Sequence, residues 1–482
     1  MSGLVVDLER PLPRALPVGS ATAVFCLGTC FAPDDELRDL RVVVDGVRHR
    51  PAAFGMPRPD HPRLRSGFWA TLPLPARTAP GSIELELWAR LASGREVGAP
   101  LGRIEIVERV PPPPVAAEPE RPGPAPPLIA ICMATFEPNP ALLRAQIESL
   151  RDQRDDRWIC LVSDDGSSPD HVASIREIIG DDPRFALSCS GRRQGFYRNF
   201  ERALGLAPDG AELFALCDQD DRWHPDKLAT LRAALGEAQL VYSDQRLVDA
   251  GGRVLRETLW RGRRNNATNL ASMLIANTIT GAATLFRRDV VELALPFPDS
   301  PGFQFHDHWL AVVALAAGDV HYVDRPLYDY VQHPGAILGQ VTSAENGRRA
   351  WRPATPRRAF AAARAAYFYG YLSREVQAQV ALVRCSGRLT ARKRRALRRF
   401  VASARSPLAF AWLALRPLRE LAGRNETLGS EAALARGVAW RALVATWARH
   451  GPAPARLACD ARFPPPGSFE QRRLRRWRAR VW

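Results

Sequence analysis

The sequence has no apolar run long enough to span a bilayer, which takes about 20 consecutive residues. The longest candidate, residues 407–415, reads PLAFAWLAL and is far too short. Residues 1–16 include Asp7 and Glu9 and lack the continuous apolar segment of a secretory signal. We therefore expect a globular protein in the cytoplasm.

Cysteine is scarce and unpatterned, with eight residues in a chain of 482. None of the spacings indicates a disulfide framework, and Cys132, Cys160 and Cys217 lie inside apolar runs. Cys26 and Cys30 are four positions apart in a β-rich stretch, which leaves a zinc or disulfide role as the minor alternative. The pattern favours buried, reduced thiols at Cys132, Cys160 and Cys217 and a structural role for Cys26 and Cys30.

Lysine is nearly absent: Lys227 and Lys393 are the only two, so arginine supplies almost all of the positive charge. The formal net charge is +16, and it is unevenly distributed. Residues 351–482 hold 28 basic and 6 acidic residues, whereas residues 1–350 hold 39 basic and 45 acidic residues. All of the excess therefore lies in the C-terminal region, a segregation that indicates an anionic partner there.

Composition changes along the chain predict four segments. Residues 1–110 contain short alternating runs broken by turn residues, a pattern typical of a small β-sandwich. Residues 111–127 are rich in proline and predict an extended linker. Residues 128–350 alternate apolar strands with amphipathic helices, and residues 351–482, rich in Ala, Leu and Arg, predict a helical basic region.

Acidic residues follow successive predicted strands of the third segment. A strand at 158–162 leads to Asp164 and Asp165, and a strand at 213–217 leads to Asp218, Asp220 and Asp221. Ligands of parallel α/β sheets bind at the carboxyl ends of the strands, so this placement indicates a nucleotide site.

The carboxylates of Asp218, Asp220 and Asp221 would repel one another unless a positive charge or hydrogen bonds compensated their negative charge. A divalent cation, Mg²⁺ or Mn²⁺, held by one or two carboxylates and by the phosphates of a substrate meets this need. The alternative is a solvated acidic turn before the helix that follows Pro225.

Several motifs in order resemble family 2 glycosyltransferases, especially bacterial rhamnosyltransferase-like members. The most specific is the string DQDDRWHPDK at 218–227, which matches that group's DQDDxWxPxK. It is preceded by a Thr-aromatic turn at 135–136, a QIESL helix at 146–150, a DDGS turn at 164–167 and a Gly195-x-x-x-Asn199 element. The match spans about residues 128–339, and ordered motifs at this spacing are far more specific than any single one.

This resemblance implies a fold and a set of site residues. The fold would be α/β, a GT-A (Rossmann-like nucleotide-diphospho-sugar transferase) domain between an N-terminal β-sandwich and the C-terminal helical basic region. The residues expected to bind the donor are Thr135, Asp164, Asp165, Asn199, Asp218 and Asp220. Those expected at the metal are Asp220, Asp221 and His333, the last from a Tyr-x-Gln-His segment at 330–333. From the residues alone, an Asx turn is an equal alternative for one of Asp164 and Asp165.

A second motif, HDHW at 306–309, aligns with the family's His-Asp-Trp-Trp. By that resemblance Asp307 would be the catalytic base that takes the acceptor proton in an inverting reaction. Gly281, His306, His308 and Trp309 would lie on the acceptor side. The alternative for Asp307 is a helix N-cap, and for Gly281 a close packing contact.

The expected activity is metal-dependent transfer of a sugar from a nucleotide-diphosphate donor to a hydroxyl of a cell-surface glycan or lipid-linked acceptor. Rhamnose is the first expectation for the sugar, and a galactofuranosyltransferase-like enzyme is the alternative. A non-catalytic glycan- or nucleic-acid-binding protein is the alternative from another class. The segment QRRLRRWRARVW at 471–482, if helical, places apolar residues on one face and predicts contact with an anionic membrane surface, with RNA binding as the rival.

Overall fold

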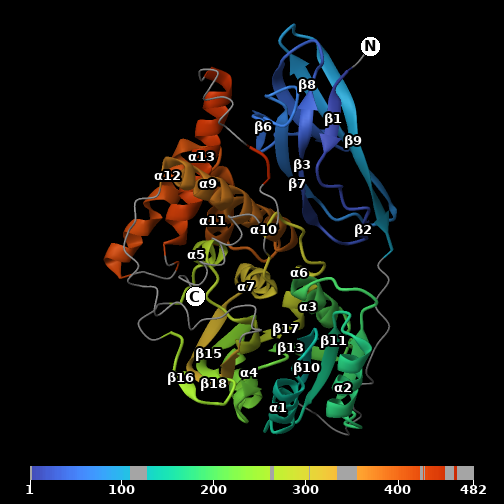
Figure 1. Ribbon diagram of the computed structural model, residues 1–482, viewed down its shortest axis with the longest axis vertical. Coiled ribbons are helices and arrows are strands. Elements are labelled where there is room, and N and C mark those ends of the chain that lie inside the picture. Colours follow the sequence, from blue (N-terminus) through green and yellow to red (C-terminus); the bar gives the residue numbers. More distant parts are fainter. Residues whose placement is uncertain are drawn as a thin grey trace.

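A computed structural model describes residues 3–108, 127–260, 265–302, 304–333, 355–423, 427, 429–450 and 461–463. The predicted linker at 111–127 and the tail at 471–482 fall almost entirely outside these ranges. In Figure 1 the N-terminal strands lie above a central sheet, and the C-terminal helices lie beside both. No helix of the described part of the chain is long and apolar enough to cross a membrane.

The N-terminal part is a sandwich of two sheets. The first has the order β1 (Val5–Leu8), β3 (Thr22–Phe31), β7 (Gly67–Leu74), β6 (Ala53–Met56). The second has the order β2 (Ala15–Pro17), β9 (Glu96–Val107), β8 (Gly81–Leu91), β4 (Leu37–Val44), β5 (Val47–His49). Residues of β8 alternate between buried and exposed, as expected of a sheet with one face in water.

The first sheet is covered on both faces, and the sequence of β3 reflects this. Val24 and Cys26 point into the sandwich core, whereas Ala23, Phe25 and Leu27 belong to the core shared with the rest of the molecule. β3 is accordingly apolar and buried at nearly every position instead of alternating. Burial raises the pKa of the Cys26 thiol to about 12, so this cysteine stays protonated.

The central sheet is mixed. Its first four strands are parallel, in the order β12 (Phe185–Cys189), β11 (Trp158–Asp164), β10 (Leu128–Thr135), β13 (Ala211–Asp218). The order continues with β17 (Thr284–Arg287), β15 (Leu240–Asp249), β18 (Val320–Gln332), β14 (Arg222–Trp223), and β16 (Val254–Arg256) pairs with β15. Because β17 is antiparallel to both β13 and β15, the sheet departs from the largely parallel one that the sequence predicts.

Helices cover this sheet. Those of its first half are α1 (Pro140–Arg151), α2 (Pro169–Ile179), α3 (Phe196–Gly205) and α4 (Lys227–Leu235). Those of its second half are α5 (Leu270–Ile275), the 3₁₀ turn η1 (Gly281–Ala283), α6 (Arg288–Ala294) and α7 (His306–Ala317). α3 packs on β10 and β11, and α4 packs on β15, β17 and β18. The α/β class and the N-terminal β-sandwich predicted from the sequence are confirmed.

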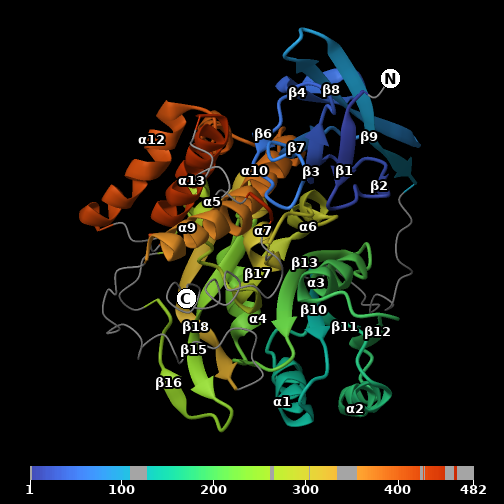
Figure 2. The same ribbon diagram turned by 45° about the horizontal axis from the view of Figure 1, so that its top comes forward.

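The C-terminal region is helical, as predicted, and it joins the other two parts. Its elements are α9 (Pro356–Ala365), the π-helical η3 (Ala366–Tyr371), α10 (Leu372–Arg384), α11 (Ala391–Ala402), α12 (Pro407–Leu415), η4 (Arg416–Ala422) and α13 (Ser430–His450). α10 contacts β3 and β7 of the sandwich and also α7 of the central domain. Figure 2 shows α10 between the sandwich and the central helices, with α12 at the outer edge.

Trp69 is the main anchor of the sandwich on the helices. Its ring is fully buried, lies 5.2 Å from Phe368 between ring centroids, and donates a 3.0 Å hydrogen bond from Nε1 to the Tyr367 hydroxyl. We predict that Trp69→Ala lowers the free energy of unfolding by about 3–5 kcal/mol because it leaves a large cavity. Urea denaturation followed by circular dichroism measures this. Trp88→Ala, on the half-exposed outer face, is the matched control and should cost much less; equal losses would contradict the anchoring role.

Candidate functional site

The carboxyl ends of three neighbouring parallel strands bring the predicted donor residues together. In the register of the sheet, Thr135 of β10 pairs with Asp164 of β11, and Ala134 pairs with Asp218 of β13. Adjacent strands lie about 4.8 Å apart, so these three side chains share one edge of the sheet. The placement of acidic residues at strand ends follows the sequence prediction.

Asp164 and Asp165 are both buried, and their oxygens organise the loops around them. Asp164 accepts hydrogen bonds from Thr135 Oγ1 at 3.1 Å, from the Gly166 and Ser167 amides at 3.1 and 2.9 Å, and from Ser167 Oγ at 2.6 Å. This is the Asx-turn alternative, realised at Asp164. A donor-binding role for Asp164 would add to this structural one.

Asp165 ties the loop after β11 to the start of α3. Its two oxygens accept from the backbone amides of Gln194 and Gly195, each at 2.7 Å. Asn199, one turn into α3, donates from its amide to the Thr135 and Ser163 carbonyls at 3.2 and 2.8 Å. Both side chains therefore fix the positions of the strand ends that carry Thr135 and Asp164.

The loop after β13 gathers carboxylates around one space. Asp218 and Asp220 are partly exposed and Asp221 is buried, with one oxygen accepting from the Val331 amide at 3.2 Å. The other oxygen of Asp221 has no hydrogen-bond partner among the described residues. Burial, and then the charges of Asp220 and Asp307, raise the pKa of Asp218 to about 7. Asp307, far away in the sequence, therefore lies close to the acidic loop.

A buried lysine lies against this acidic cluster of Asp218, Asp220, Asp221 and Asp307. Lys227 is fully buried, its ammonium lies 3.3 Å from the Trp223 ring centroid, and it donates a hydrogen bond to the Ala282 carbonyl. Burial lowers the pKa of Lys227, while the charges of Asp221 and Asp218 act to raise it. Lys227 and Trp223 belong to the motif that carries the resemblance, but Lys227 is not among the predicted site residues. The rarity of lysine in this arginine-rich chain is the sequence feature that could have indicated a special role for Lys227.

Gln219 is a second residue that the prediction leaves without a role. Its side-chain oxygen accepts from the Phe136 amide at 2.8 Å, and its amide nitrogen donates to the Phe136 carbonyl at 3.2 Å. This reciprocal pair fastens the loop after β10 to the loop after β13. The Arg193 guanidinium lies over the Phe136 ring at 3.9 Å from its centroid, at the same rim.

His333 and Asp220 are brought together as the predicted metal site requires. The end of β18 places His333 Nε2 2.8 Å from an Asp220 oxygen. No group of three or more His, Cys, Asp or Glu side chains within the described residues is arranged to hold a metal ion. Fewer protein ligands suffice where a metal also binds substrate phosphates, so the partnerless oxygen of Asp221, the pair Asp220–His333 and the crowded negative charge fit a divalent cation.

Asp307 lies in the first turn of α7 and does not occupy the capping position. Phe305 is the N-cap, and it makes no side-chain cap hydrogen bond. One oxygen of Asp307 accepts from the adjacent His308 amide at 2.6 Å. Asp307 is partly exposed and its charge acts on Asp218 and Tyr330. The N-cap alternative is therefore wrong, although a carboxylate in the first turn still complements the helix dipole.

Gly281 and His306 are in close contact behind Asp307. A Cβ atom at Gly281 would lie 2.8 Å from His306 Nε2 and 3.5 Å from the Asp307 Cβ, so close packing, the alternative to an acceptor contact, accounts for the glycine. The His306 ring stacks on Phe200 at 3.7 Å between centroids. Burial lowers the pKa of His306 to about 3, so this ring is neutral at physiological pH.

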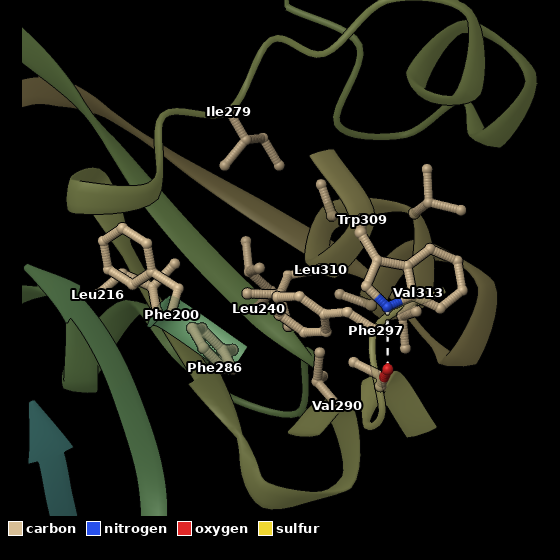
Figure 3. Packing of buried hydrophobic residues seen from close by; sticks show 14 of the residues in the cluster. Phe200, Leu216, Leu240, Ile279, Phe286, Val290, Phe297, Trp309, Leu310 and Val313 are labelled. Atoms are coloured by element: carbon tan, nitrogen blue, oxygen red, sulfur yellow. Dashed lines mark hydrogen bonds between the residues drawn. The ribbon is translucent and has the colours of Figure 1, made fainter. Parts of the chain in front are cut away.

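His308 and Trp309, the other predicted acceptor-side residues, point into the packing of α7. His308 Nε2 lies 2.8 Å from the Met273 carbonyl, and Trp309 is fully buried, with Nε1 donating to the Ala294 carbonyl at 3.0 Å. Figure 3 shows the Trp309 ring among Phe297, Val290 and Val313. In this conformation Asp307 is the residue of the HDHW motif that faces the carboxylate cluster.

Comparison with known proteins gives a family for the segment that contains most of this site. Residues 130–293 match the model of glycosyl transferase family 2. The uncharacterized protein y4gI of Sinorhizobium fredii (strain NBRC 101917 / NGR234) is 30% identical over 130 residues, which are 26% of this chain and 14% of that protein. The chain thus spans about a seventh of the length of this relative. Asp307 and His333 lie beyond the matched segment.

Solved structures of glycosyltransferases are also similar over much of the chain. The mannosyltransferase PcManGT from Pyrobaculum calidifontis, in complex with GDP-Man and Mn²⁺, covers 67% of this chain and 88% of its own, with 15% identity and a TM-score of 0.35. Residues 1–349 of S. aureus TarS, in complex with UDP-GlcNAc, cover 67% and 92%, with 16% identity and a TM-score of 0.40. The family match and the sheet order together identify the GT-A domain.

The crowded carboxylates predict a pH-dependent cost to stability in the metal-free protein. The pKa of Asp218 is raised, so its ionisation disfavours the folded state, and the penalty grows from about pH 4 to about pH 7. We expect Asp218→Asn to be at most about 1 kcal/mol more stable than wild type at pH 4.5 and about 2 kcal/mol more stable at pH 7.5. Urea unfolding in EDTA measures both values.

Asp181→Asn, at an exposed position away from the cluster, is the control and should show no pH-dependent gain. A stability difference between Asp218→Asn and wild type that is the same at pH 4.5 and pH 7.5 would contradict the electrostatic account of the site.

Proposed function

From the glycosyl transferase family 2 domain that the chain contains over residues 130–293, we propose that this protein transfers a sugar from a nucleotide-diphosphate donor to a hydroxyl acceptor. The observation that carries the proposal is the convergence of carboxylates from separate parts of the chain. Thr135 ends β10, Asp164 ends β11, Asp218 ends β13 with Asp220 in the loop after it, and Asp307 approaches from α7.

The donor would lie along the carboxyl ends of β10, β11 and β13. Oxygens of Asp164 and Asp165 accept hydrogen bonds of the kind that a nucleobase imide or a ribose hydroxyl donates. Both are held by backbone amides, so their orientation is fixed before the donor arrives. Such preorganisation reduces the entropy lost on binding.

Asp220, Asp221 and His333 are the residues that would hold a divalent metal, Mg²⁺ or Mn²⁺. When bound, the metal supplies positive charge beside the donor's diphosphate. The protein's own part is to orient the ligands. The Val331 amide holds one oxygen of Asp221, and the Asp220–His333 contact fixes the other two side chains relative to one another.

The chemical step assigned to this site is an inverting displacement with Asp307 as the general base. The Asp307 carboxylate takes the proton of the acceptor hydroxyl, and the acceptor oxygen forms a bond to the anomeric carbon. The bond between that carbon and the diphosphate oxygen breaks, and the diphosphate leaves with the electron pair. Burial lowers the pKa of His306 to about 3, which makes its imidazole a weak base, and the ring is buried behind Asp307. The partly exposed Asp307 carboxylate is therefore the better placed proton acceptor of the two.

The finer assignment is rhamnose as the sugar, with a galactofuranosyltransferase-like enzyme as the alternative. The DQDDRWHPDK string supports the first, and the order of sandwich, GT-A domain and helical region supports the second. A cell-surface glycan or a lipid-linked molecule is the proposed acceptor, and the reaction would belong to the biosynthesis of cell-envelope polysaccharides.

We assign the domains as 1–110, 128–350 and 351–482, with the linker at 111–127 between the first two. We propose that the protein acts in the cytoplasm, at the inner face of the membrane.

A non-catalytic glycan- or nucleic-acid-binding protein is the competing function. Carboxylates crowded at a strand edge repel the phosphates of a nucleic acid. Binding of a neutral glycan does not require carboxylates that are packed so closely that their pKa values rise. The site therefore favours chemistry at a diphosphate.

Donor binding is predicted to require a divalent cation. The negatively charged cluster would otherwise face a negatively charged diphosphate. Isothermal calorimetry with UDP and dTDP, in Mn²⁺ and again after chelation, should show affinity only in the presence of the metal. Asp221→Asn should weaken the part of the nucleotide affinity that depends on the metal. Equal affinity with and without metal would refute the proposed role of the metal in donor binding.

Asp307 is predicted to serve chemistry and not donor binding. Asp307→Asn keeps the size and hydrogen-bonding capacity of the side chain but cannot take a proton, so turnover should fall by about two to four orders of magnitude while donor affinity survives. Asp220→Asn should damage both. Single-turnover kinetics and calorimetry on the two variants separate these outcomes. Near-normal turnover by a folded Asp307→Asn protein would remove Asp307 from the mechanism.

A further inference from the structure

A basic and apolar groove lies on the C-terminal helices, away from the carboxylate site. Helices α11 and α12 enclose it, with a volume of about 960 Å³. Its basic wall is α11 and its apolar wall is α12. In Figures 1 and 2 α12 lies at the periphery of the molecule, on the side away from the β-sandwich.

The α11 wall presents unneutralised positive charge. The helix reads ARKRRALRRFVA and contains no acidic residue. Four arginines line the groove, and within the described residues none of them forms an ion pair: Arg394, Arg395, Arg398 and Arg399. Arg395, Arg398 and Arg399 are exposed. A guanidinium suits a phosphate because it can donate two parallel hydrogen bonds.

The α12 wall presents large apolar side chains to water. Leu408, Trp412 and Leu415 are spaced at i, i+4 and i+7, which places them on one face of the helix. Leu408 is 85% exposed and Leu415 is 59% exposed, and the surface continues into η4 with Leu418 at 57% and Leu421 at 86%. Contiguous exposed leucines of this kind mark an interaction site.

We propose that this surface, the α11–α12 groove with Leu418 and Leu421, binds an anionic phospholipid membrane. The arginines of α11 bind lipid phosphates, and the leucines of α12 and η4 insert among the acyl chains, as an interfacial amphipathic element does. Single-stranded nucleic acid is the poorer occupant because its bases stack on exposed aromatic rings. The one aromatic residue in the groove lining, Trp412, is half-buried with Arg399 and Arg416 near its ring faces.

This surface is formed by residues other than those of the tail at 471–482 and of the carboxylate site, so the proposal goes beyond transferase activity. The test uses the full chain, vesicles of phosphatidylcholine, and vesicles that also contain 30% phosphatidylglycerol, roughly a typical anionic fraction. Arg395→Glu/Arg398→Glu should reduce co-sedimentation with the anionic vesicles at least tenfold, since each basic residue near such a surface strengthens binding severalfold. Leu408→Ser/Leu415→Ser should weaken binding in the same assay.

Matched controls are Arg10→Glu/Arg90→Glu, an equal charge change at exposed positions of the sandwich, and Val47→Ser, at an exposed apolar position. Both should bind like wild type. Unchanged binding by both groove variants would overturn the proposal and leave any membrane contact to the tail. Loss of affinity for a 20-nucleotide RNA, at roughly the length of several single-strand sites, with vesicle binding intact would overturn it in favour of nucleic acid.

Vesicle binding and transfer to a soluble acceptor are measured separately, so failure of the membrane proposal can be distinguished from failure of the proposed transferase function. The groove variants should keep normal turnover of a soluble acceptor, because none of the changed residues touches the carboxylate site. All changed side chains are exposed, and thermal melts verify folding. If the arginine variant does not fold, the leucine variant still decides between the outcomes.

Discussion

The mutual repulsion of four carboxylates at one sheet edge is the constraint around which this protein is built. Asp218, Asp220, Asp221 and Asp307 come from two distant segments, and burial together with the charges of Asp220 and Asp307 raises the pKa of Asp218. Among the described residues, Lys227 is the cation whose charge acts on Asp218 and Asp221, and it is itself desolvated between Trp223 and Tyr328. A buried charge that is incompletely compensated lowers the free energy of unfolding. Such destabilisation is typical of sites that bind a charged ligand.

The rest of the structure holds this edge in place. Asp165, Asn199 and Gln219 use their side chains to fix neighbouring loops, so the strand ends cannot separate to relieve the repulsion. Behind α7 the packing of Trp309 and His308 sets the position of Asp307. The same core continues through α10 to the sandwich sheet, where Trp69 is buried. The N-terminal sheet is thus part of the scaffold of the central domain and not an independent attachment.

The sequence predicts most of the fold and the acidic half of the site, for identifiable reasons. The strands predicted at 158–162 and 213–217 are found within β11 and β13, and Asp164 and Asp218 end these strands as expected, because a strong apolar pattern decides both. It does not predict the antiparallel β17, since pairing direction depends on long-range contacts that have no local signal. Nor does it predict which residues of HDHW face the site. Adjacent helical residues point about 100° apart, so a motif of four cannot all face one ligand; only tertiary packing decides that His308 and Trp309 turn inward.

The two lysines show how the chain places small cations where an arginine would not fit. Lys227 inserts its ammonium between two aromatic rings and still donates to the Ala282 carbonyl, and Lys393 of α11 donates at 2.8 Å to the carbonyl of Gly318, the C-cap of α7. An ammonium is compact and donates in three directions, whereas a guanidinium is planar and larger. Both lysines therefore stabilise the elements that surround the carboxylate cluster. Lys227 lies against the cluster, and Lys393 binds the C-terminal end of the helix that carries Asp307. Because a cation at a helix C-terminus complements a carboxylate in the first turn, α11 contributes to the position of Asp307 through Lys393, while its arginines remain free to face outward.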